Sequence, residues 1–387
     1  MADLKETIIS SMVNGPDVLQ DIVSARRNGR DYVTDRFHTK TIVNRLHPDK
    51  LSLRVSEIRT AASGAKTFRF VSCGGALPYF EAGQYLNVFT EIDGVRTSRP
   101  YSISSSPKQR GYYEITVARI PAGFVSDYFL DKVKVSDTFE ANGPAGVFHY
   151  NPVFHKKRSV FLAGGSGITP FMSMISEALE SGAERDITLI YGVRNEDAAI
   201  FKDELISFEK TYKNFRFHLV LSEAPEGYSG RRGFIDEACI RELAGNTDDC
   251  TFYLCGPQVM TDFCYEALCK LKVSKNHIRR EMFGSRQDIQ NEPGWPANLT
   301  GNEVFKLKVG DRTIDALSRE SILTALERAG IRVNVCCRSG ECSYCRVRLV
   351  SGKVFMPRGV LLRLADEKFG FIHSCKAYPM EDLEIEF

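Results

Sequence analysis

The sequence predicts a multidomain protein in which three β-containing units follow a helical N-terminal extension. Residues 51–152 carry short β runs separated by turn signals, which predicts a small antiparallel β-barrel. Residues 153–284 alternate strands with helical stretches, which predicts βαβ units around a parallel sheet. Residues 303–387 form a further compact unit, with a helix around Ser321–Ala329 and a cysteine-rich loop. At a typical size of about 150 residues per domain, a chain of 387 residues suggests two or three domains.

The first 50 residues are polar and are predicted to be helical. Apolar residues recur there at helical spacing in two groups, namely Leu4, Ile8, Ile9, Met12 and Val13, then Val18, Leu19, Ile22 and Val23. The turn signal Asn14-Gly15-Pro16 separates the two predicted helices. We expect a cap that buries Ile8, Met12 and Val23. Partner docking and dimerisation are the alternatives.

Individual strands are predicted in both larger units. In the barrel they are Leu51–Ile58, Thr67–Val71, Tyr85–Thr90 and Tyr113–Val117. In the parallel sheet they are Ser159–Ala163, Ile187–Tyr191, Phe215–Leu221 and Thr251–Leu254. Residues 285–302 are rich in Pro, Asn and Gly without periodicity and are predicted to form a linker.

Composition excludes several classes of protein. The net charge of +2 argues against a nucleic-acid binder, which usually carries a strongly basic domain. No stretch reaches 18 consecutive apolar residues, so membrane insertion is not expected. The N-terminus lacks the apolar core of a signal peptide, so we expect a cytoplasmic location. The eleven cysteines are then expected to be reduced thiols or metal ligands.

Four cysteines near the end of the chain have the spacing of iron–sulfur ligands. Cys337, Cys342 and Cys345 form a C-x4-C-x2-C loop, and Cys375 follows after a gap of 29 residues. This is the plant-type pattern for a [2Fe–2S] cluster, in which four thiolates hold two irons. The alternatives are buried thiols or a zinc site, although zinc usually requires two C-x2-C pairs. The adjacent Cys336 is expected not to be a ligand.

A second motif, Arg99-Pro100-Tyr101-Ser102, supplies the groups that a flavin needs. Tyr offers a planar face for the ring, Arg a cation for the phosphate, and Ser a hydrogen bond at the reactive N5. Alone, the motif could be a strand edge with a surface Arg. It is supported by Arg119, by Gly123-Phe124-Val125-Ser126 before a predicted helix, whose N-terminus can bind phosphate, and by Gly143-Pro144-Ala145-Gly146.

A third motif, Gly164-Gly165-Ser166-Gly167-Ile168-Thr169-Pro170, follows a hydrophobic strand and opens a helix. Its glycines allow backbone to approach a pyrophosphate, and Pro170 suits the first turn of a helix. Pro170 stands where the third Gly of the GxGxxG fingerprint would be, so a structural turn is the alternative. Two shorter segments accompany it, Cys255-Gly256-Pro257 and Glu281-Met282-Phe283.

The order of these motifs resembles the ferredoxin–NADP reductase superfamily, over residues 51 to 387. Residues 304–387 resemble a plant-type ferredoxin domain of β-grasp fold, through the cysteine loop and His373-Ser374-Cys375. One departure is Ser343, since the family usually has Gly directly after the second cysteine. The order flavin, nicotinamide, ferredoxin matches the phthalate dioxygenase reductase and phenylacetyl-CoA epoxidase reductase types.

The resemblance implies a role for each motif residue. Arg99 would bind the flavin phosphate, Tyr101, preceded by Pro100, would pack on the isoalloxazine, and Ser102 would approach N5. The remaining expected cofactor contacts are Arg119, Gly123, Val125, Ser126 and Phe283 for flavin, and Gly165, Gly167, Thr169, Pro170, Ser222, Arg231, Cys255, Gly256 and Pro257 for the nicotinamide nucleotide. Ser102, Cys255 and Glu281 would form the hydride-transfer constellation. FAD is favoured over FMN, which relatives of phthalate dioxygenase reductase use.

These expectations define an NAD(P)H-dependent flavin/iron–sulfur electron-transfer reductase with FAD and a [2Fe–2S] cluster. Its expected acceptor is a redox protein such as an oxygenase, and a hybrid-cluster protein or another redox enzyme is the alternative. An electron-transfer subunit without turnover of its own is a further alternative. Glu223 after the strand ending at Leu221 favours NADH, while Arg231 and Arg232 leave NADPH open.

Overall fold

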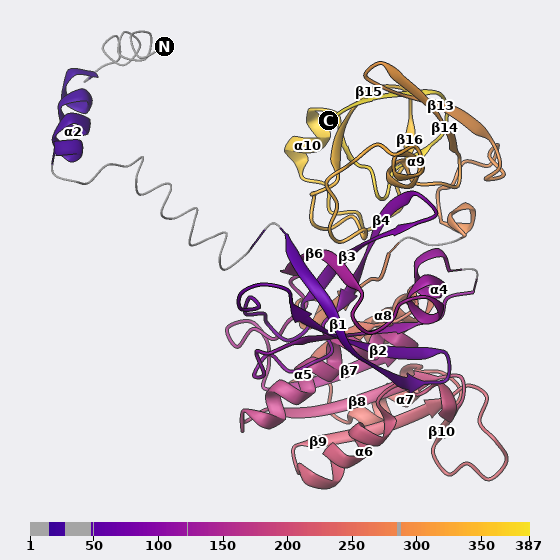
Figure 1. The fold of residues 1–387 in the computed structure, drawn as a ribbon. Helices are drawn as coiled ribbons and strands as arrows, with labels where there is room; N and C mark the ends of the chain where they lie inside the picture. The colour runs from indigo at the N-terminus through magenta and orange to yellow at the C-terminus, as the bar shows by residue number, and fades with distance from the viewer. Residues whose placement is uncertain (1–14, 28–47, 49, 122, 285–287) are drawn as a thin grey trace. The chain divides into compact units, whose positions relative to one another are not determined.

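The computed structural model describes residues 15–27, 48, 50–121, 123–284 and 288–387. The chain divides into two units, Met1–Asp49 and Lys50–Phe387. Within the first unit, helix α2 spans Gly15–Arg27 and so begins inside the predicted turn signal (Figure 1). The predicted helix that contains Ile8 and Met12 lies outside the described residues. Val23 is 45% exposed, so its burial under a cap stays a prediction.

The second unit begins with a six-stranded antiparallel sheet. Its strands are β1 (Leu51–Ala62), β2 (Ala65–Ser72), β3 (Tyr85–Ile92), β4 (Val95–Ser102), β5 (Tyr113–Ala118) and β6 (Thr138–Ala145), in the spatial order β4-β3-β6-β1-β2-β5. A bridge between Ile103 and Ile115 joins the two outer strands and closes the sheet into a barrel. Closure removes the exposed edges that an open sheet would present. The predicted barrel is confirmed.

Helix α4 (Phe124–Asp131) packs onto the barrel through Phe129. This ring is fully buried and contacts Phe68 of β2 and Phe139 of β6, with centroids 5.4 and 5.2 Å apart respectively. It also contacts Tyr101 at 5.5 Å. Buried aromatic clusters contribute large apolar area with defined geometry. The cluster therefore fixes the predicted flavin motif on β4 relative to the start of α4.

The second sheet has six parallel strands. They are β7 (Arg158–Gly164), β8 (Asp186–Val193), β9 (Phe215–Leu221), β10 (Arg231–Arg232), β11 (Thr251–Cys255) and β12 (Ile278–Glu281), in the order β10-β9-β8-β7-β11-β12. The accompanying helices are α5 (Ile168–Glu180), α6 (Lys202–Thr211), α7 (Glu237–Ala244) and α8 (Gln258–Lys270), with short 3-10 turns at Gly165–Gly167, Glu196–Ala198 and Lys275–His277. The strand order reverses beside β7, where such folds bind their ligands.

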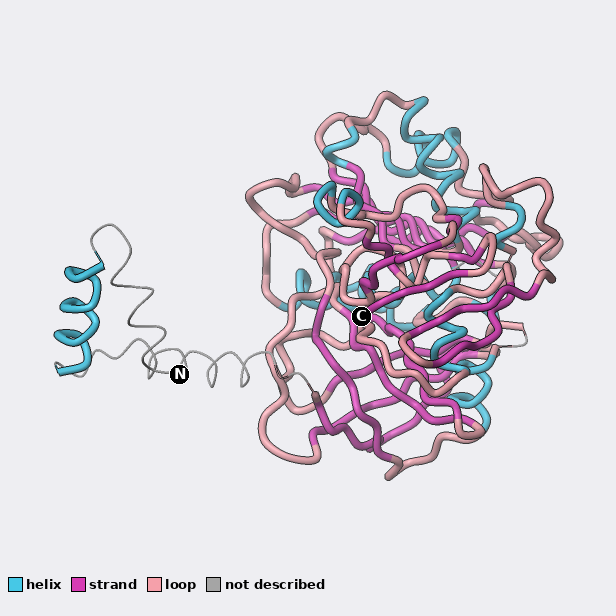
Figure 2. Tube along the Cα trace, turned by 90° about the horizontal axis from the view of Figure 1, so that it is seen from above, coloured by secondary structure: helices cyan, strands magenta, loops and turns pink. Residues whose placement is uncertain are grey.

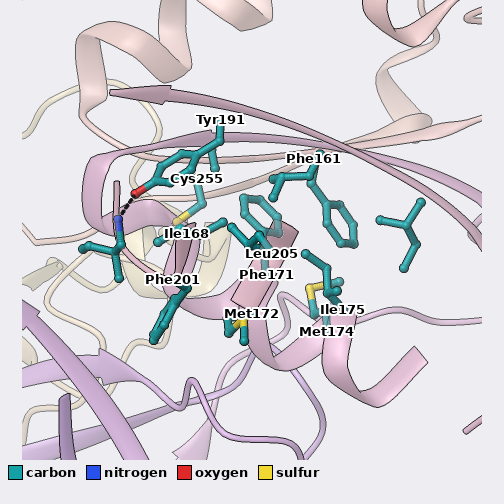
Figure 3. Packing of buried hydrophobic residues seen from close by; sticks show 14 of the residues in the cluster. Phe161, Ile168, Phe171, Met172, Met174, Ile175, Tyr191, Phe201, Leu205 and Cys255 are labelled. Atoms are coloured by element: carbon teal, nitrogen blue, oxygen red, sulfur yellow. Dashed lines mark hydrogen bonds between the residues drawn. The ribbon is translucent and has the colours of Figure 1, made fainter. Parts of the chain in front are cut away.

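Alternate residues of the buried strands enter two separate cores. Phe161 and Ala163 pack with α5 and α6, whereas Val160 and Leu162 pack with α7 and α8. Figure 3 shows the first of these cores, in which the rings of Phe161 and Phe171 stack with centroids 4.7 Å apart. Alternation of this kind is what a sheet covered on both faces requires.

The third sheet is mixed and has five strands, with helix α9 (Ile322–Arg328) packed against it. Its strands are β13 (Val304–Val309), β14 (Arg312–Leu317), β15 (Arg346–Ser351), β17 (Phe371–His373) and β19 (Leu383–Glu386), accompanied by helix α10 (Leu364–Lys368) and a small ribbon of β16 (Val354–Phe355) and β18 (Tyr378–Pro379). Strands β13 and β19 are parallel and their outer neighbours antiparallel. This agrees with the predicted β-grasp unit, here called the ferredoxin unit. Figure 2 marks the strands in magenta and the helices in cyan.

The segment before the ferredoxin unit packs onto that unit where it is described. Residues Ile289–Asn291 form a 3-10 turn, and Ile289 is buried. Trp295 contacts the rings of Phe355 and Tyr378 at 5.3 and 6.4 Å. The described part of the predicted linker is therefore anchored by aromatic packing. In the described part of the chain no helix is both long and apolar enough to span a bilayer.

Candidate functional site

A cavity of about 340 Å³ lies where the barrel, the parallel sheet and the ferredoxin unit meet, and is called the barrel cavity below. The barrel contributes Arg99, Pro100, Tyr101, Ser102, Thr116, Val117, Ala118, Ile120, Gly123, Phe124, Val125 and Ser126. The other two units contribute Ser166, Thr169, Phe283, Gly284, Ser321, Leu323, Thr324, Arg338 and Cys375. The predicted flavin motif and one predicted cluster cysteine therefore line the same cavity.

Ser102 and Arg99 of the predicted flavin motif differ in their surroundings. Ser102 is 3% exposed, and its Oγ has no hydrogen-bond partner among the described residues. Arg99 Nη1 donates to Thr97 Oγ1 at 2.9 Å and to the Ser98 carbonyl at 2.7 Å. Burial, together with the charge of nearby Arg338, lowers the Arg99 pKa to about 10. An unpaired buried hydroxyl is costly, and a bound hydrogen-bonding ligand would relieve that cost.

The start of helix α4 lines the barrel cavity, and the backbone there is packed too closely for a side chain at Gly123. A Cβ on Gly123 would lie 2.0 Å from Ser126 Oγ, so glycine alone fits this N-cap position. Free N–H groups at a helix N-terminus attract anions. Arg119 lies elsewhere, because it lines the neighbouring cavity and pairs with Asp127 at 2.9 Å and Asp131 at 2.6 Å.

The neighbouring cavity, called the sheet-edge cavity below, has a volume of about 990 Å³ and lies at the carboxyl ends of the parallel strands. Gly164, Gly165, Gly192, Ser222 and Pro257 are among its lining residues. It shares Ala118, Ile120 and Ser166 with the barrel cavity, so the two adjoin. A ligand in one cavity would therefore lie beside a ligand in the other.

Close backbone approach explains why the turn after β7 is glycine-rich. A Cβ on Gly167 would lie 2.1 Å from the Cys255 carbonyl oxygen, so this turn packs directly on Cys255-Gly256. The Gly165 carbonyl accepts a hydrogen bond from the Tyr191 hydroxyl at 2.9 Å. That hydroxyl in turn accepts from the Ile200 N–H at 3.1 Å, the dashed contact in Figure 3. Tyr191 thus fixes the turn to the neighbouring strand.

The two predicted nucleotide-loop residues after the glycines lie in helix α5, which begins at Ile168. Thr169 Oγ1 donates to the Ser166 carbonyl at 3.0 Å and lines the barrel cavity. Pro170 is buried in the first turn of α5, where a helix tolerates proline, as predicted. It lines neither of the two cavities.

Two of the three predicted hydride-transfer residues lie side by side. Cys255 and Glu281 are partners in the β11–β12 ladder, and both are buried. Burial, with a smaller contribution from Glu341, raises the pKa of the Glu281 carboxyl well above its usual value. Its Oε2 has no hydrogen-bond partner among the described residues. Ser102 lies on the barrel cavity, which Phe283, two residues beyond Glu281, also lines.

The predicted determinants of nucleotide preference are separated in the structure. Ser222 lines the sheet-edge cavity, and Glu223 after it pairs with Arg194 at 3.5 Å. Arg231 lines neither cavity, because its guanidinium pairs with Glu242 at 2.8 Å and Asp236 at 3.7 Å. The Arg231 guanidinium thus already forms ion pairs with two carboxylates of the same chain.

The thiols of the four predicted cluster cysteines come together, and Cys336 lies beside them. The Cys342 thiol interacts with the thiols of both Cys336 and Cys337, and the Cys345 thiol interacts with that of Cys375. The Cys337 Sγ also accepts from the backbone N–H groups of Ser339 and Cys342, both at 3.4 Å. No compact group of three ligands for a single metal ion occurs among the described residues. Four thiols that converge in this way suit a cluster of two irons.

Ser343, the departure from the family pattern, occupies a left-handed backbone position with φ of 58°. Such a conformation favours glycine and strains other residues. His373 supports the loop here, because one ring nitrogen lies 3.1 Å from Ser343 Oγ and the other 2.9 Å from the Gly340 carbonyl. The imidazole is fully buried between the two contacts. A side-chain hydrogen bond thus accompanies the strained residue.

Sequence reasoning missed the residues that join the ferredoxin unit to the barrel. Arg338 pairs with Glu327 and donates to Thr97 and Ser98 on β4. The Val335 carbonyl accepts from Asn87 of β3 at 3.0 Å. The available signal was the position of Arg338 directly after Cys337, inside the predicted cluster loop.

Comparison with protein families agrees with this geometry. The chain matches an oxidoreductase FAD-binding domain over residues 53–150 and an oxidoreductase NAD-binding domain over residues 161–266. It matches a 2Fe-2S iron-sulfur cluster binding domain over residues 306–380. The order of the three is the order predicted from the motifs.

Relatives cover most of this chain or part of it. The chain is 26% identical to the glycine betaine monooxygenase reductase subunit of Chromohalobacter salexigens over 363 residues, covering 90% of this chain and 97% of the relative. It is 30% identical to ferredoxin–NADP reductase B of Sorangium cellulosum over 244 residues, covering 62% and 99%. The solved structure of phthalate dioxygenase reductase superposes with a TM-score of 0.66 and 26% identity, covering 87% of this chain and 98% of that one.

The chain therefore belongs to the ferredoxin–NADP reductase superfamily, as the group that carries a C-terminal [2Fe–2S] domain. It is an NAD(P)H-dependent electron-transfer reductase whose cofactors are FAD and a [2Fe–2S] cluster. The residues present fit both groups. The unpaired Ser102 hydroxyl and the Gly123 cap line the barrel cavity, and the thiols of Cys337, Cys342, Cys345 and Cys375 converge at the cysteine loop.

The buried Glu281 carboxyl predicts a pH-dependent stability. Because its folded-state pKa is raised, the native state holds a proton that the unfolded state releases, and stability falls as pH rises above the usual glutamate value. Glu281→Gln removes this titration. The free energy of unfolding of the variant relative to that of the native protein should rise from about pH 5 to about pH 8, by at most about 1.4 kcal/mol per pH unit.

Thermal unfolding of both proteins across this pH range is the measurement. Exposed Glu91 provides the matched control, and Glu91→Gln should show no such trend. A constant difference between Glu281→Gln and the native protein at all pH values would show that Glu281 titrates normally.

Proposed function

We propose that this reductase passes electrons from NADH to an oxygenase component. We propose further that the electrons enter the cluster on the side of Cys375 and leave it on the side of Cys342. One observation carries the proposal. Cys375 lines the barrel cavity, whereas Cys342 is exposed. The cysteine loop thus has one ligand at the expected flavin and another at the surface. When bound, NADH supplies a hydride, FAD accepts the pair and releases single electrons, and the cluster carries one at a time.

The barrel residues are proposed to hold the flavin. Tyr101 packs on the ring, Ser102 donates its unpaired hydroxyl towards N5, and Arg99 binds phosphate. Support comes from the lining of the barrel cavity and from the fixed position of Tyr101 against Phe129. Gly123, Val125 and Ser126 at the start of α4 are proposed to hold the pyrophosphate, with Phe283 covering the ring. Arg119 is less available to bind the flavin, because its guanidinium forms ion pairs with two carboxylates.

The sheet-edge cavity is proposed to hold the nicotinamide nucleotide. Gly165 and Ser222 line it, and Gly167 fixes the turn against Cys255. Thr169, Pro170, Gly256 and Pro257 complete the turn-and-helix frame. Cys255 and Glu281 are proposed to position the nicotinamide where the two cavities adjoin, beside Ser102. A protonated Glu281 can donate a hydrogen bond there, which a charged carboxylate cannot.

The nucleotide is proposed to be NADH. Glu223 follows β9 at the position where an acidic residue binds ribose hydroxyls in related folds. Arg231, which could otherwise bind a 2′-phosphate, is held by Glu242 and Asp236. Arg232 Nη2 donates to the Pro225 carbonyl at 2.9 Å. Both arginines thus have partners within the chain.

The acceptor is proposed to dock on the exposed side of the cysteine loop. Tyr344, between two cluster cysteines, is 51% exposed. Leu361 is 62% exposed, and its N–H donates to the Gly340 carbonyl at 3.0 Å, which holds it beside the loop. Exposed apolar side chains around a redox centre are suited to transient protein contacts. The oxygenase identity is supported by the glycine betaine monooxygenase reductase subunit, which is similar to this chain.

The domain limits are proposed from the same elements. We assign residues 1–50 to the helical extension, 51–152 to the FAD-binding barrel and 153–284 to the nucleotide-binding unit. Residues 285–302 are the connection and 303–387 the ferredoxin unit. The bounds of the three sheets support this division. Location in the cytoplasm is also proposed, because none of the eleven cysteines, all of which are described, takes part in a disulfide.

Loss of one cluster ligand should separate the two halves of the activity. In Cys342→Ala the barrel and the parallel sheet are untouched, so NADH–ferricyanide reduction should stay within about twofold, while cytochrome c reduction should fall about tenfold or more. Cys336→Ala, in the same loop but outside the ligand set, is the matched control and should keep both rates. Unchanged cytochrome c reduction in a variant shown to lack iron would contradict the proposed exit route.

The acceptor class is tested with reduced protein and purified partners. Re-oxidation of the NADH-reduced reductase should be about tenfold faster with an oxygenase component than with a hybrid-cluster protein at equal concentration, because docking must match the loop surface. Faster re-oxidation by the hybrid-cluster protein would favour the alternative acceptor. No NADH-driven turnover with any acceptor, despite full cofactor loading, would reject the reductase.

A further inference from the structure

We propose that Arg338, from the ferredoxin unit, is a flavin-binding residue that joins Arg99 in holding the flavin phosphate. The ferredoxin unit would then complete the flavin site as well as receive its electrons. The inference rests on the proposed placement of FAD in the barrel cavity. It assigns to the residue after Cys337 a role separate from holding the cluster.

Arg338 reaches the barrel cavity from the cysteine loop. It is 7% exposed and lines the cavity together with Arg99, although the two residues are far apart in sequence. Its Nη2 donates to Thr97 Oγ1 at 3.2 Å and to Ser98 Oγ at 3.3 Å, and it pairs with Glu327. These contacts hold the guanidinium against the strand that carries the predicted flavin motif.

Part of the guanidinium is left without a partner. Arg338 Nε is buried and has no hydrogen-bond partner among the described residues. A buried, charged donor of this kind carries a substantial desolvation cost unless a ligand accepts from it. Because the side chain lines the barrel cavity, a ligand in that cavity is the available acceptor.

The charge of the cavity also requires an anion. The described lining residues include two arginines, Arg99 and Arg338, and no carboxylate. Glu327, outside the lining, pairs with Arg338 and accepts from Thr97 Oγ1 at 3.0 Å, so it compensates one of the two positive charges. A phosphate matches two guanidinium groups in charge and in hydrogen-bonding geometry. The phosphate of the flavin is therefore the expected partner.

This arrangement couples cofactor binding to the docking of the ferredoxin unit. Arg99 contacts Thr97, and Thr97 contacts both Arg338 and Glu327, so a phosphate on the two arginines closes a network across the interface. Coupling between two binding events is reciprocal. Bound flavin would thus stabilise the position of Cys375 at the cavity, and a docked ferredoxin unit would retain flavin.

The test measures FAD affinity after the flavin has been removed and the cluster retained, with iron content as a check. Titration of this protein with FAD, followed by flavin fluorescence, should show binding about tenfold weaker in Arg338→Met, or about 1.4 kcal/mol. Arg99→Met should weaken FAD in the same way. Arg348→Met, on the exposed ion pair with Glu386, is the matched control and should bind FAD as the native protein does.

The variant Glu327→Gln tests whether Arg338 binds the flavin phosphate or only holds the ferredoxin unit against the barrel. The amide of Gln can still accept from Thr97 across the interface, but it removes the negative charge and leaves two uncompensated arginines, so FAD should bind as tightly as in the native protein or more tightly. Riboflavin, which lacks the phosphate, should bind Arg338→Met and the native protein equally. Equal weakening of FAD in Arg338→Met and Glu327→Gln, or equal loss of riboflavin and FAD affinity in Arg338→Met, would overturn the proposal.

The outcomes also separate this inference from the proposed function. If Arg99→Met weakens FAD and Arg338→Met stays within about twofold of the native protein, the Arg338 assignment fails while the flavin placement stands. If neither variant weakens FAD, the placement of flavin in the barrel cavity fails as well. Should Arg338→Met not fold, Arg338→Lys keeps the charge without the planar fork and should still weaken FAD, and native affinity there would reject the assignment.

Discussion

The buried contact between the cysteine loop and strand β4 is the interaction on which the rest of the site depends. Arg338 and Glu327 form an ion pair that is closed on the barrel side by Thr97. A second contact lies nearby, where Lys376 Nζ donates to the Gly284 carbonyl at 2.8 Å. Breaking one partner of a buried ion pair leaves an uncompensated charge, so such a contact resists separation. It holds Cys375 at the cavity that the flavin motif lines.

A continuous hydrophobic core also fixes the position of the parallel sheet relative to the barrel. Barrel residues Ala65, Ala82 and Phe148 belong to the same buried cluster as helix α5 and the parallel strands. Helix α5 begins directly after the glycine-rich turn, so its packing also fixes where the nucleotide turn meets the barrel. The two cavities can therefore adjoin at Ser166 without any contact from a ligand. Pre-formed sites of this kind lose less conformational freedom when they bind.

Local patterns were enough to predict most of the fold and the motifs, but not the contacts between units. Continuous apolar runs predicted the buried strands β7 and β11, because burial on both faces removes the alternation of apolar and polar residues. Strand β4 gave little signal, since its polar residues face a cavity and an interface instead of a core. The pairing of Arg231 with Glu242, and the role of Arg338, depend on residues brought together by tertiary structure. Spacing along the chain carries no information about such partners.

The central claim is that electrons reach the cluster from flavin within one molecule, across the interface that Arg338 and Cys375 form. Anaerobic mixing with NADH, followed by freeze-quench electron paramagnetic resonance at several protein concentrations, tests it most directly. We expect the signal of the reduced cluster to appear after flavin bleaching, at a rate that does not depend on protein concentration. A rate proportional to protein concentration would mean that electrons pass between molecules, which would contradict the account.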